Sequence, residues 1–110
     1  MLPRYKKLHW TEHCKLKMRQ YGLSAGKILQ VLRKPERKEK GIAPGCTALM
    51  QTRKSFSRVK NPPGEIWLMY KDVKEARRII SAWRYPGISR PGESIPIPAE
   101  IKEELRHGNF

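Results

Sequence analysis

The stretch HWTEHCKLKMRQYGLS, residues 9–24, carries the signals that decide the fold of the N-terminal half. Thr11 is a favourable N-cap residue, and Glu12 places a negative charge in the first turn, where it interacts well with the helix dipole. Gly22 is typical of the position that follows the last helical residue. The stretch therefore predicts a helix over 12–21 that begins after a threonine and stops at a glycine.

The two sides of this helix differ in character. Cys14, Met18 and Tyr21 recur at helical spacing, so they are expected to face the core. His13 and Lys17 lie one turn apart along the edge of that face. We therefore expect the imidazole and the ammonium group to be neighbours.

The first five residues of the stretch also spell H-x-x-E-H, a motif of zinc proteases. In those enzymes both histidines lie on one helix and bind the metal, while the glutamate activates a water molecule. Here Thr11 begins the helix, so His9 precedes it and its ring would not lie above that of His13. We therefore predict neither a metal site nor a cofactor.

Outside this stretch the sequence predicts one more N-terminal helix, several strands and an irregular C-terminal segment. Ser24 caps the second helix, which Pro35 ends. Four prolines in 85–98 predict an extended strap. The elements expected in chain order are a strand or extended arm at 7–10, the second helix at 25–34, an edge strand at 36–43, strands at 46–52 and 65–70, and a terminal helix at 99–106.

Residues 71–84 fit two structures. Their apolar residues recur at helical spacing behind a capping box that begins at Asp72. The alternative is a hairpin turn at 71–75 followed by a second central strand at 77–84. The pattern alone does not separate the two. In either case Trp67, Met69 and Trp83 are expected in the core rather than on a surface that stacks RNA bases.

Charge is the strongest compositional feature. The chain has 110 residues with 24 Lys and Arg against 10 Asp and Glu, which gives a net charge of +14. Residues 1–85 hold 21 basic and 6 acidic residues, whereas 86–110 hold 3 and 4, so the body carries +15 and the tail −1. A body this basic attracts polyanions. The simpler interpretation is a solvated surface, but the size of the charge favours RNA or a ribonucleoprotein as partner.

Cysteine usage and hydropathy indicate a cytoplasmic protein. Cys14 and Cys46 are too few and too far apart for a metal framework, and we expect two reduced, packed thiols. The sequence has no apolar run of membrane-spanning length and no signal-peptide pattern. We therefore expect no membrane association, and a monomer or small oligomer.

Two segments resemble a known family. The run 9–24 resembles the His-headed first helix of a small prokaryotic domain of unknown function, with its Lys-Met pair and its Gly-Leu-Ser helix break. The segments EIWLMY (65–70) and RIISAWRYPG (78–87) are similar to the central hairpin of that family. The family is similar to the BrnT and RelE-type toxins, many of which cleave RNA, often on the ribosome, and usually pair with an antitoxin. The resemblance favours the strand over the helix at 77–84.

The resemblance implies an α+β fold in which two N-terminal helices pack on a four-stranded, mostly antiparallel sheet. Residues 1–87 would form this toxin-like domain, and 88–110 a C-terminal extension that packs on it. The long basic loop and the proline-rich extension depart from the family pattern. Because a shared fold does not fix function, the chain is expected to be either an endoribonuclease or a non-catalytic nucleic-acid or ribosome-binding module. A third class is an interaction role with an acidic, antitoxin-like partner.

Metal-independent RNA cleavage needs a base for the 2′-hydroxyl, cations for the developing charge and an acid for the leaving oxygen. His13 could exchange the proton and Lys17 could supply charge. Arg78, Arg84 and Tyr85 could contribute from the last strand. The competing interpretation makes His13 a hydrogen-bonded structural residue and the arginines phosphate contacts or solvated charges.

Backbone binding needs only exposed cations. The candidates for RNA binding are Arg53, Lys54, Arg58 and Lys60 in the loop after the third strand, together with Lys71 and Arg77. The acidic residues of the terminal helix could instead dock on the basic body and compete with RNA. Deleting 88–110 would then strengthen RNA binding.

Overall fold

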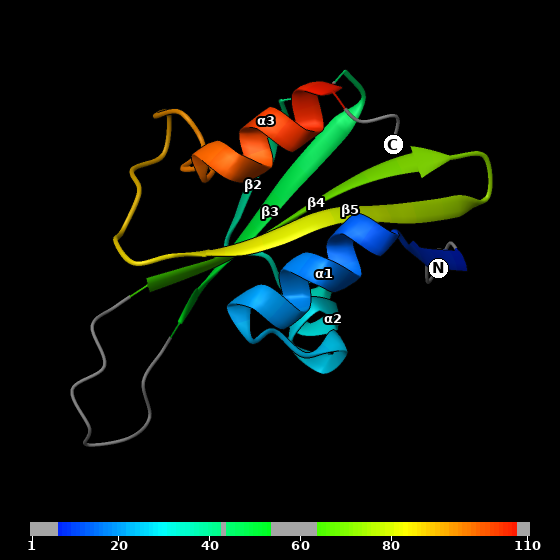
Figure 1. The fold of residues 1–110 in the computed structure, drawn as a ribbon. Coiled ribbons are helices and arrows are strands. Elements are labelled where there is room, and N and C mark those ends of the chain that lie inside the picture. Colours follow the sequence, from blue (N-terminus) through cyan, green and yellow to red (C-terminus); the bar gives the residue numbers. More distant parts are fainter. Residues whose placement is uncertain (1–6, 43, 54–63, 108–110) are drawn as a thin grey trace.

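A five-stranded sheet forms the centre of the fold, and helices lie on both of its faces (Figure 1). The structure, a computed structural model, describes residues 7–42, 44–53 and 64–107. Its elements in chain order are β1 (Lys7–Trp10), α1 (Glu12–Tyr21), α2 (Ala25–Arg33), β2 (Arg37–Lys40), β3 (Cys46–Arg53), β4 (Gly64–Val73), β5 (Ala76–Tyr85) and α3 (Ala99–His107). The α+β class is confirmed.

The sheet has the strand order β1-β5-β4-β3-β2, with antiparallel pairs throughout except at one edge. There β1 runs parallel to β5, with Lys7 opposite Ala76 and Trp10 opposite Ile79. The expected four-stranded sheet was therefore one strand short. Local sequence allowed a strand at 7–10, but its partner lies far along the chain, and no local signal specifies such a pairing.

The predicted bounds of α1 are confirmed by its caps. The Thr11 hydroxyl accepts a hydrogen bond from the backbone N–H of Cys14 over 3.0 Å. Gly22 has φ 64°, a left-handed conformation that glycine adopts without steric cost. Ser24 caps α2 as predicted, and this helix ends at Arg33, one residue earlier than expected.

The strand interpretation of residues 77–84 is confirmed. The hairpin turn is narrower than predicted, because β4 continues to Val73 and β5 begins at Ala76. A register shift opposite Met69 and Tyr70 marks a β-bulge in β5. Because of the bulge, Ile79 and Ala82 lie in one core cluster and Ile80 and Trp83 lie in the other. Residues three apart therefore share a face of this strand, and this is the helical spacing that made the sequence ambiguous.

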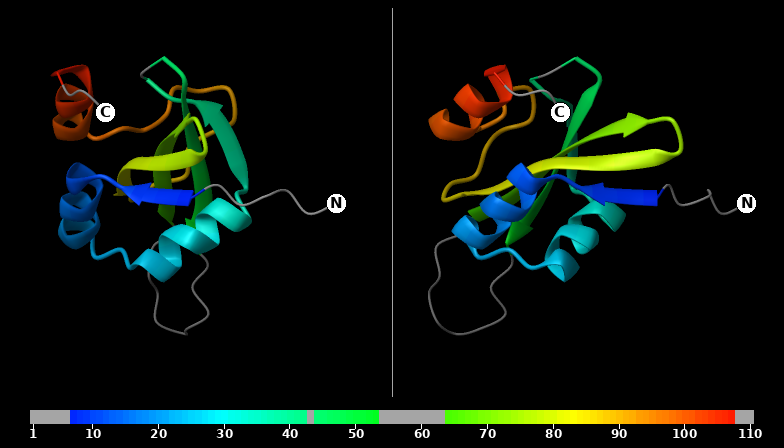
Figure 2. Two further views of the ribbon diagram at one scale, coloured as in Figure 1. Left: turned by 90° about the vertical axis from the view of Figure 1, so that its right-hand side faces the viewer. Right: turned by 45° about the vertical axis from the view of Figure 1, so that its right-hand side comes forward.

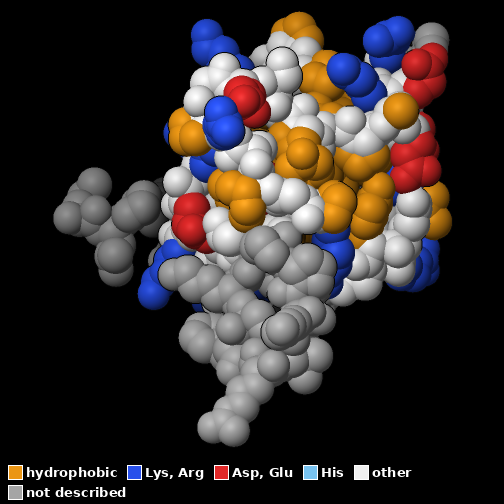
Figure 3. Space-filling view, turned by 90° about the vertical axis from the view of Figure 1, so that its left-hand side faces the viewer, with side chains coloured by type: hydrophobic (Ala, Val, Ile, Leu, Met, Phe, Trp, Pro, Cys, Tyr) orange, Lys and Arg blue, Asp and Glu red, His pale blue; other side chains and the backbone are white. Residues whose placement is uncertain are grey.

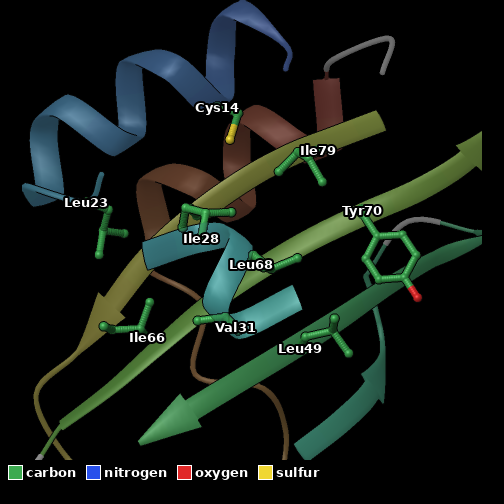
Figure 4. Close-up of a cluster of buried hydrophobic side chains, with 10 residues drawn as sticks. Cys14, Leu23, Ile28, Val31, Leu49, Ile66, Leu68, Tyr70 and Ile79 are labelled. Carbon is green, nitrogen blue, oxygen red and sulfur yellow. The ribbon is translucent and has the colours of Figure 1, made fainter. Parts of the chain in front are cut away.

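Two apolar clusters lie on opposite faces of the sheet. The cluster beneath α1 and α2 contains Ile28, Val31, Leu68 and Ile79 (Figure 4). The cluster beneath α3 contains Trp67 and Trp83, which are both fully buried and stack with ring centroids 6.1 Å apart. Trp67, Met69 and Trp83 are thus core residues, as predicted. Cys14 and Cys46 are also buried, one in each cluster.

The segment 86–98 forms the expected strap, without helix or strand. It ends in α3, which runs past α1 on the other side of β5 (Figure 2). The indole of Trp83 donates to the carbonyl oxygen of Pro96 over 2.9 Å, and Ile101 and Leu105 anchor α3 in the second cluster. Seen from the strap side, hydrophobic side chains gather between charged ones (Figure 3). None of the helices in the described ranges has the length and apolar character needed to cross a membrane.

Candidate anion site between the first and last helices

Strand β5 holds α1 at both ends. The Thr11 hydroxyl lies 3.1 Å and 3.0 Å from the carbonyl oxygens of Ile79 and Ile80 and donates to them at the bulge. At the other end, Arg84 Nε donates to the carbonyl oxygen of Tyr21 over 2.6 Å, and Nη2 donates to that of Gly22 over 3.1 Å. These contacts fix the rotation of α1, so the edge with His13 and Lys17 is turned toward α3.

His13 lies between the sheet and α3. Its Nε2 is 3.0 Å from Ser81 Oγ, and its Nδ1 is 2.7 Å from Glu104 Oε2. A neutral ring satisfies both contacts when Ser81 donates to Nε2 and Nδ1–H donates to the carboxylate. Burial lowers the pKa of His13, and the charge of Lys17 adds to this effect although Glu104 opposes it. The neutral imidazole is therefore favoured.

Lys17 is the most unusual residue of the site, because its side chain is only 4 % exposed. Its Nζ donates to Gln20 Oε1 over 3.1 Å and forms ion pairs with Glu104 over 3.1 Å and with Glu100 over 3.8 Å. A buried ammonium group requires such partners, because an unpaired charge is costly away from water. Both carboxylates come from α3.

Glu100 completes the contacts between the two helices. Gln20 Nε2 donates to its Oε1 over 2.6 Å, and the Tyr21 hydroxyl donates to the same atom over 3.1 Å. These two hydrogen bonds lower the pKa of Glu100. Burial and the contact with Glu100 raise the pKa of Tyr21 to about 12. Two acidic residues of the terminal helix thus contact the buried lysine of α1.

Ser81, His13 and Glu104 follow one another in the order of a serine-hydrolase triad. In that chemistry the base bridges a hydroxyl nucleophile and a carboxylate that orients it. Here Ser81 is fully buried on β5, beneath α3. A substrate carbonyl therefore has no access to the hydroxyl. The three residues form a buried hydrogen-bond network that fixes the His13 ring.

The predicted catalytic residues are only partly brought together. His13 and Lys17 share one carboxylate, as described above, whereas Arg84 is engaged by the carbonyl groups at the end of α1. Arg78 and Tyr85 lie near opposite ends of β5, about 20 Å apart at the usual rise of a strand. No single phosphate could contact all five side chains in this arrangement.

The predicted RNA-binding residues do not form one group. Lys71 lies directly opposite Arg78, which was predicted as a catalytic residue, in the β4–β5 pair. Arg77 is held by Asp72 through a contact of 2.8 Å and lies over the ring of Tyr70 at 4.3 Å. Arg53 is the last residue of β3. Lys54, Arg58 and Lys60 lie outside the described residues.

The structure also places basic residues together that the sequence did not group. A groove of about 800 Å³ lies between β2, the turn that follows it and the C-terminal segment. Lys38, Lys40 and Lys102 line it, together with Ile95 and Ile97. The lysines of the edge strand were a visible signal, but their proximity to Lys102 depends on how the strap folds back.

The premise that rejected a zinc site is confirmed, because His9 lies on β1 while His13 lies on α1. Within the described ranges, no three histidine, cysteine or carboxylate side chains are grouped so that they could hold a metal ion. Comparison with protein-family models, curated proteins and solved structures found no match for this chain.

Proposed function

We propose that the protein binds RNA across the end of the β4–β5 hairpin. The observation that carries this proposal is the direct opposition of Lys71 and Arg78 in an antiparallel pair. Like charges in this position repel each other and destabilise the sheet. An anion bound between them would remove the repulsion, and the phosphates of RNA are anions that recur along a chain.

The surroundings of this pair favour a polyanion over a single small anion. Lys7 on β1 and Lys74 in the turn are both exposed at the same end of the sheet. Arg77 forms an ion pair with Asp72 within the hairpin, so we assign it a role in stabilising the hairpin rather than in binding RNA. The whole chain carries +14, which supports association with nucleic acid through release of counterions.

The experiment compares two double variants that remove the same charge. Lys71→Gln/Arg78→Gln changes the proposed site, whereas Lys15→Gln/Arg33→Gln changes exposed cations on α1 and α2. Binding of a fluorescent single-stranded RNA is measured by anisotropy at several salt concentrations. The first variant should lose roughly tenfold in affinity, and its salt slope should fall by about 1.4 for two lost phosphate contacts. Equal losses in both variants would refute a localised site, and equal binding of DNA would broaden the ligand class.

RNA cleavage is a second candidate, supported by the neutral imidazole of His13 next to the ammonium group of Lys17. An imidazole near neutrality can act as a base, and an adjacent cation can stabilise a phosphorane. The resemblance to BrnT and RelE-type toxins points to the ribosome as the setting. The test is incubation of the protein with translating ribosomes and with naked RNA, with and without a chelator. His13→Ala should abolish cleavage, whereas RNA binding at the Lys71–Arg78 pair should persist.

A further inference from the structure

One carboxylate of α3 joins the two candidate site residues of α1. Glu104 Oε2 lies 2.7 Å from His13 Nδ1, and Oε1 lies 3.1 Å from Lys17 Nζ. The two donors are one helical turn apart, so they present themselves side by side to a single anionic group. A phosphate offers the same pair of charged oxygen acceptors as a carboxylate.

The burial of Lys17 is not accounted for by stability alone. Buried ion pairs are often no more stabilising than apolar residues of similar volume, because desolvation offsets the attraction. Methionine in place of Lys17 would pack on the same face without this cost. The lysine is therefore better explained by a need to bind an anion at this place.

We infer that His13 and Lys17 form a binding site for a phosphate group of the RNA backbone, and that Glu104 occupies this site until the ligand displaces it. The inference rests on the proposed function for its RNA ligand. The phosphate site itself can be tested without RNA.

The helix can stay docked while the carboxylate leaves. Ile101 is fully buried and Leu105 is 5 % exposed, and both pack in the cluster that contains Ile80 and Trp83. The Glu104 side chain, by contrast, is 42 % exposed and can turn toward solvent. Displacement therefore needs a change of side-chain rotamer rather than release of α3.

Because α3 covers the apolar face of the sheet, deletion of 88–110 would uncover that face as well as remove the acidic residues that compete with RNA. A change of charge at Glu104 is a more specific test of this competition. The test variant is Glu104→Gln, and Glu103→Gln is the matched control with the same change in net charge. Glu103 is the adjacent residue of α3, points about 100° away, and pairs with Arg106 of its own helix.

Two measurements on the full chain test the inference. The first is affinity for the single-stranded RNA described above, where Glu104→Gln should bind roughly tenfold more tightly than Glu103→Gln. The second follows the His13 ring resonances by NMR while inorganic phosphate is added, with chloride at equal ionic strength as reference. Phosphate should shift them in Glu104→Gln, and adding Lys17→Met to that variant should abolish the shift.

Equal gains in RNA affinity for the two glutamine variants would overturn the inference, because the gain would then reflect net charge alone. A phosphate response that persists after Lys17→Met would also overturn it. A phosphate response at His13 without RNA binding by any variant would refute the proposed function and leave the phosphate site standing. The two failures can therefore be told apart.

Discussion

Arg84 Nε donates to the carbonyl oxygen of Tyr21 over 2.6 Å, so the end of the last strand holds the end of the first helix. The guanidinium also binds the carbonyl oxygen of Gly22, and these carbonyl groups lack partners within the helix. Charge-assisted hydrogen bonds of this kind contribute about 1.5–3 kcal/mol each at most.

We expect Arg84→Ala to lower the free energy of unfolding by about 2 kcal/mol, measured by urea denaturation. The free energy of unfolding of Arg84→Lys should lie between those of the wild type and Arg84→Ala. Lysine keeps a cation near the helix C-terminus but loses the second hydrogen bond. Arg33→Ala, at an exposed position at the end of α2, is the control. If Arg84→Ala unfolds at the urea concentration of the wild type, the contact does not hold the helix.

The second prediction concerns stability at mildly acidic pH. Because the pKa of His13 is lowered in the folded protein, the unfolded chain binds more protons in the range below its ordinary pKa of 6.5. The free energy of unfolding should therefore be highest above that pH and decline as the pH falls through 6.5 toward the lower folded value. His13→Gln should flatten this part of the profile, measured by chemical denaturation at several pH values.

His9→Gln, which changes an exposed histidine on β1, is the matched control for this profile. A decline that is identical in the wild type and in His13→Gln would assign the pH dependence to other groups. The contribution of the hydrogen-bonded Glu100 to the free energy of unfolding is also lost in acid. This loss occurs as the pH falls through its lowered folded pKa, below 4.5, so the two effects separate along the pH axis.

A third prediction addresses the strap. Ser89 Oγ donates to Glu65 Oε1 over 2.7 Å and accepts from Arg37 Nη1 over 2.7 Å, and both of these partners are buried. Ser89→Ala should cost about 1–3 kcal/mol, because it removes the hydroxyl that pairs the buried Arg37 Nη1 and leaves Glu65 Oε1 with the hydrogen bond from Trp67 Nε1. Amide hydrogens of 86–98 should then exchange faster, as measured by mass spectrometry. Ser94→Ala, at an exposed position of the same strap, should leave exchange unchanged.

A fourth prediction separates structure from function at Lys17. Lys17→Met should leave the free energy of unfolding unchanged or raise it by about 1 kcal/mol. The carboxylates left behind are 42 % and 48 % exposed, so water can solvate them. In the Glu104→Gln background, the same substitution should abolish the phosphate response. A loss of several kcal/mol in a thermal or urea unfolding experiment would instead show that the ion pair holds the fold.

Local signals in the sequence predicted the helices well, because their determinants are local. Thr11 and Gly22 fix α1 through contacts within a few residues, and the core positions of Trp67 and Trp83 follow from their size and apolar character. The parallel partner of β1 could not be predicted in this way, since it depends on a register set far along the chain.

The candidate site was predicted in part for the same reason. His13 and Lys17 were expected to be neighbours from helical spacing alone, and the structure places them on one carboxylate. The position of Arg84 followed from no pattern, because its partners are backbone carbonyl groups of another element. The bulge at Ile80 shifts the alternation of apolar residues in β5 by one position. The sequence pattern alone therefore did not identify β5 as a strand.

The strand order has a consequence for how the chain is made. Strand β5 completes the sheet for β1, yet it is synthesised after both N-terminal helices, and the central strand β4 also comes late. Apolar faces of α1 and α2 therefore leave the ribosome before the surface that covers them exists. Long-range pairing of this kind slows folding. The N-terminal half, which is strongly basic, therefore cannot complete its packing until β5 has emerged up to residue 85, and during this time it is close to ribosomal RNA.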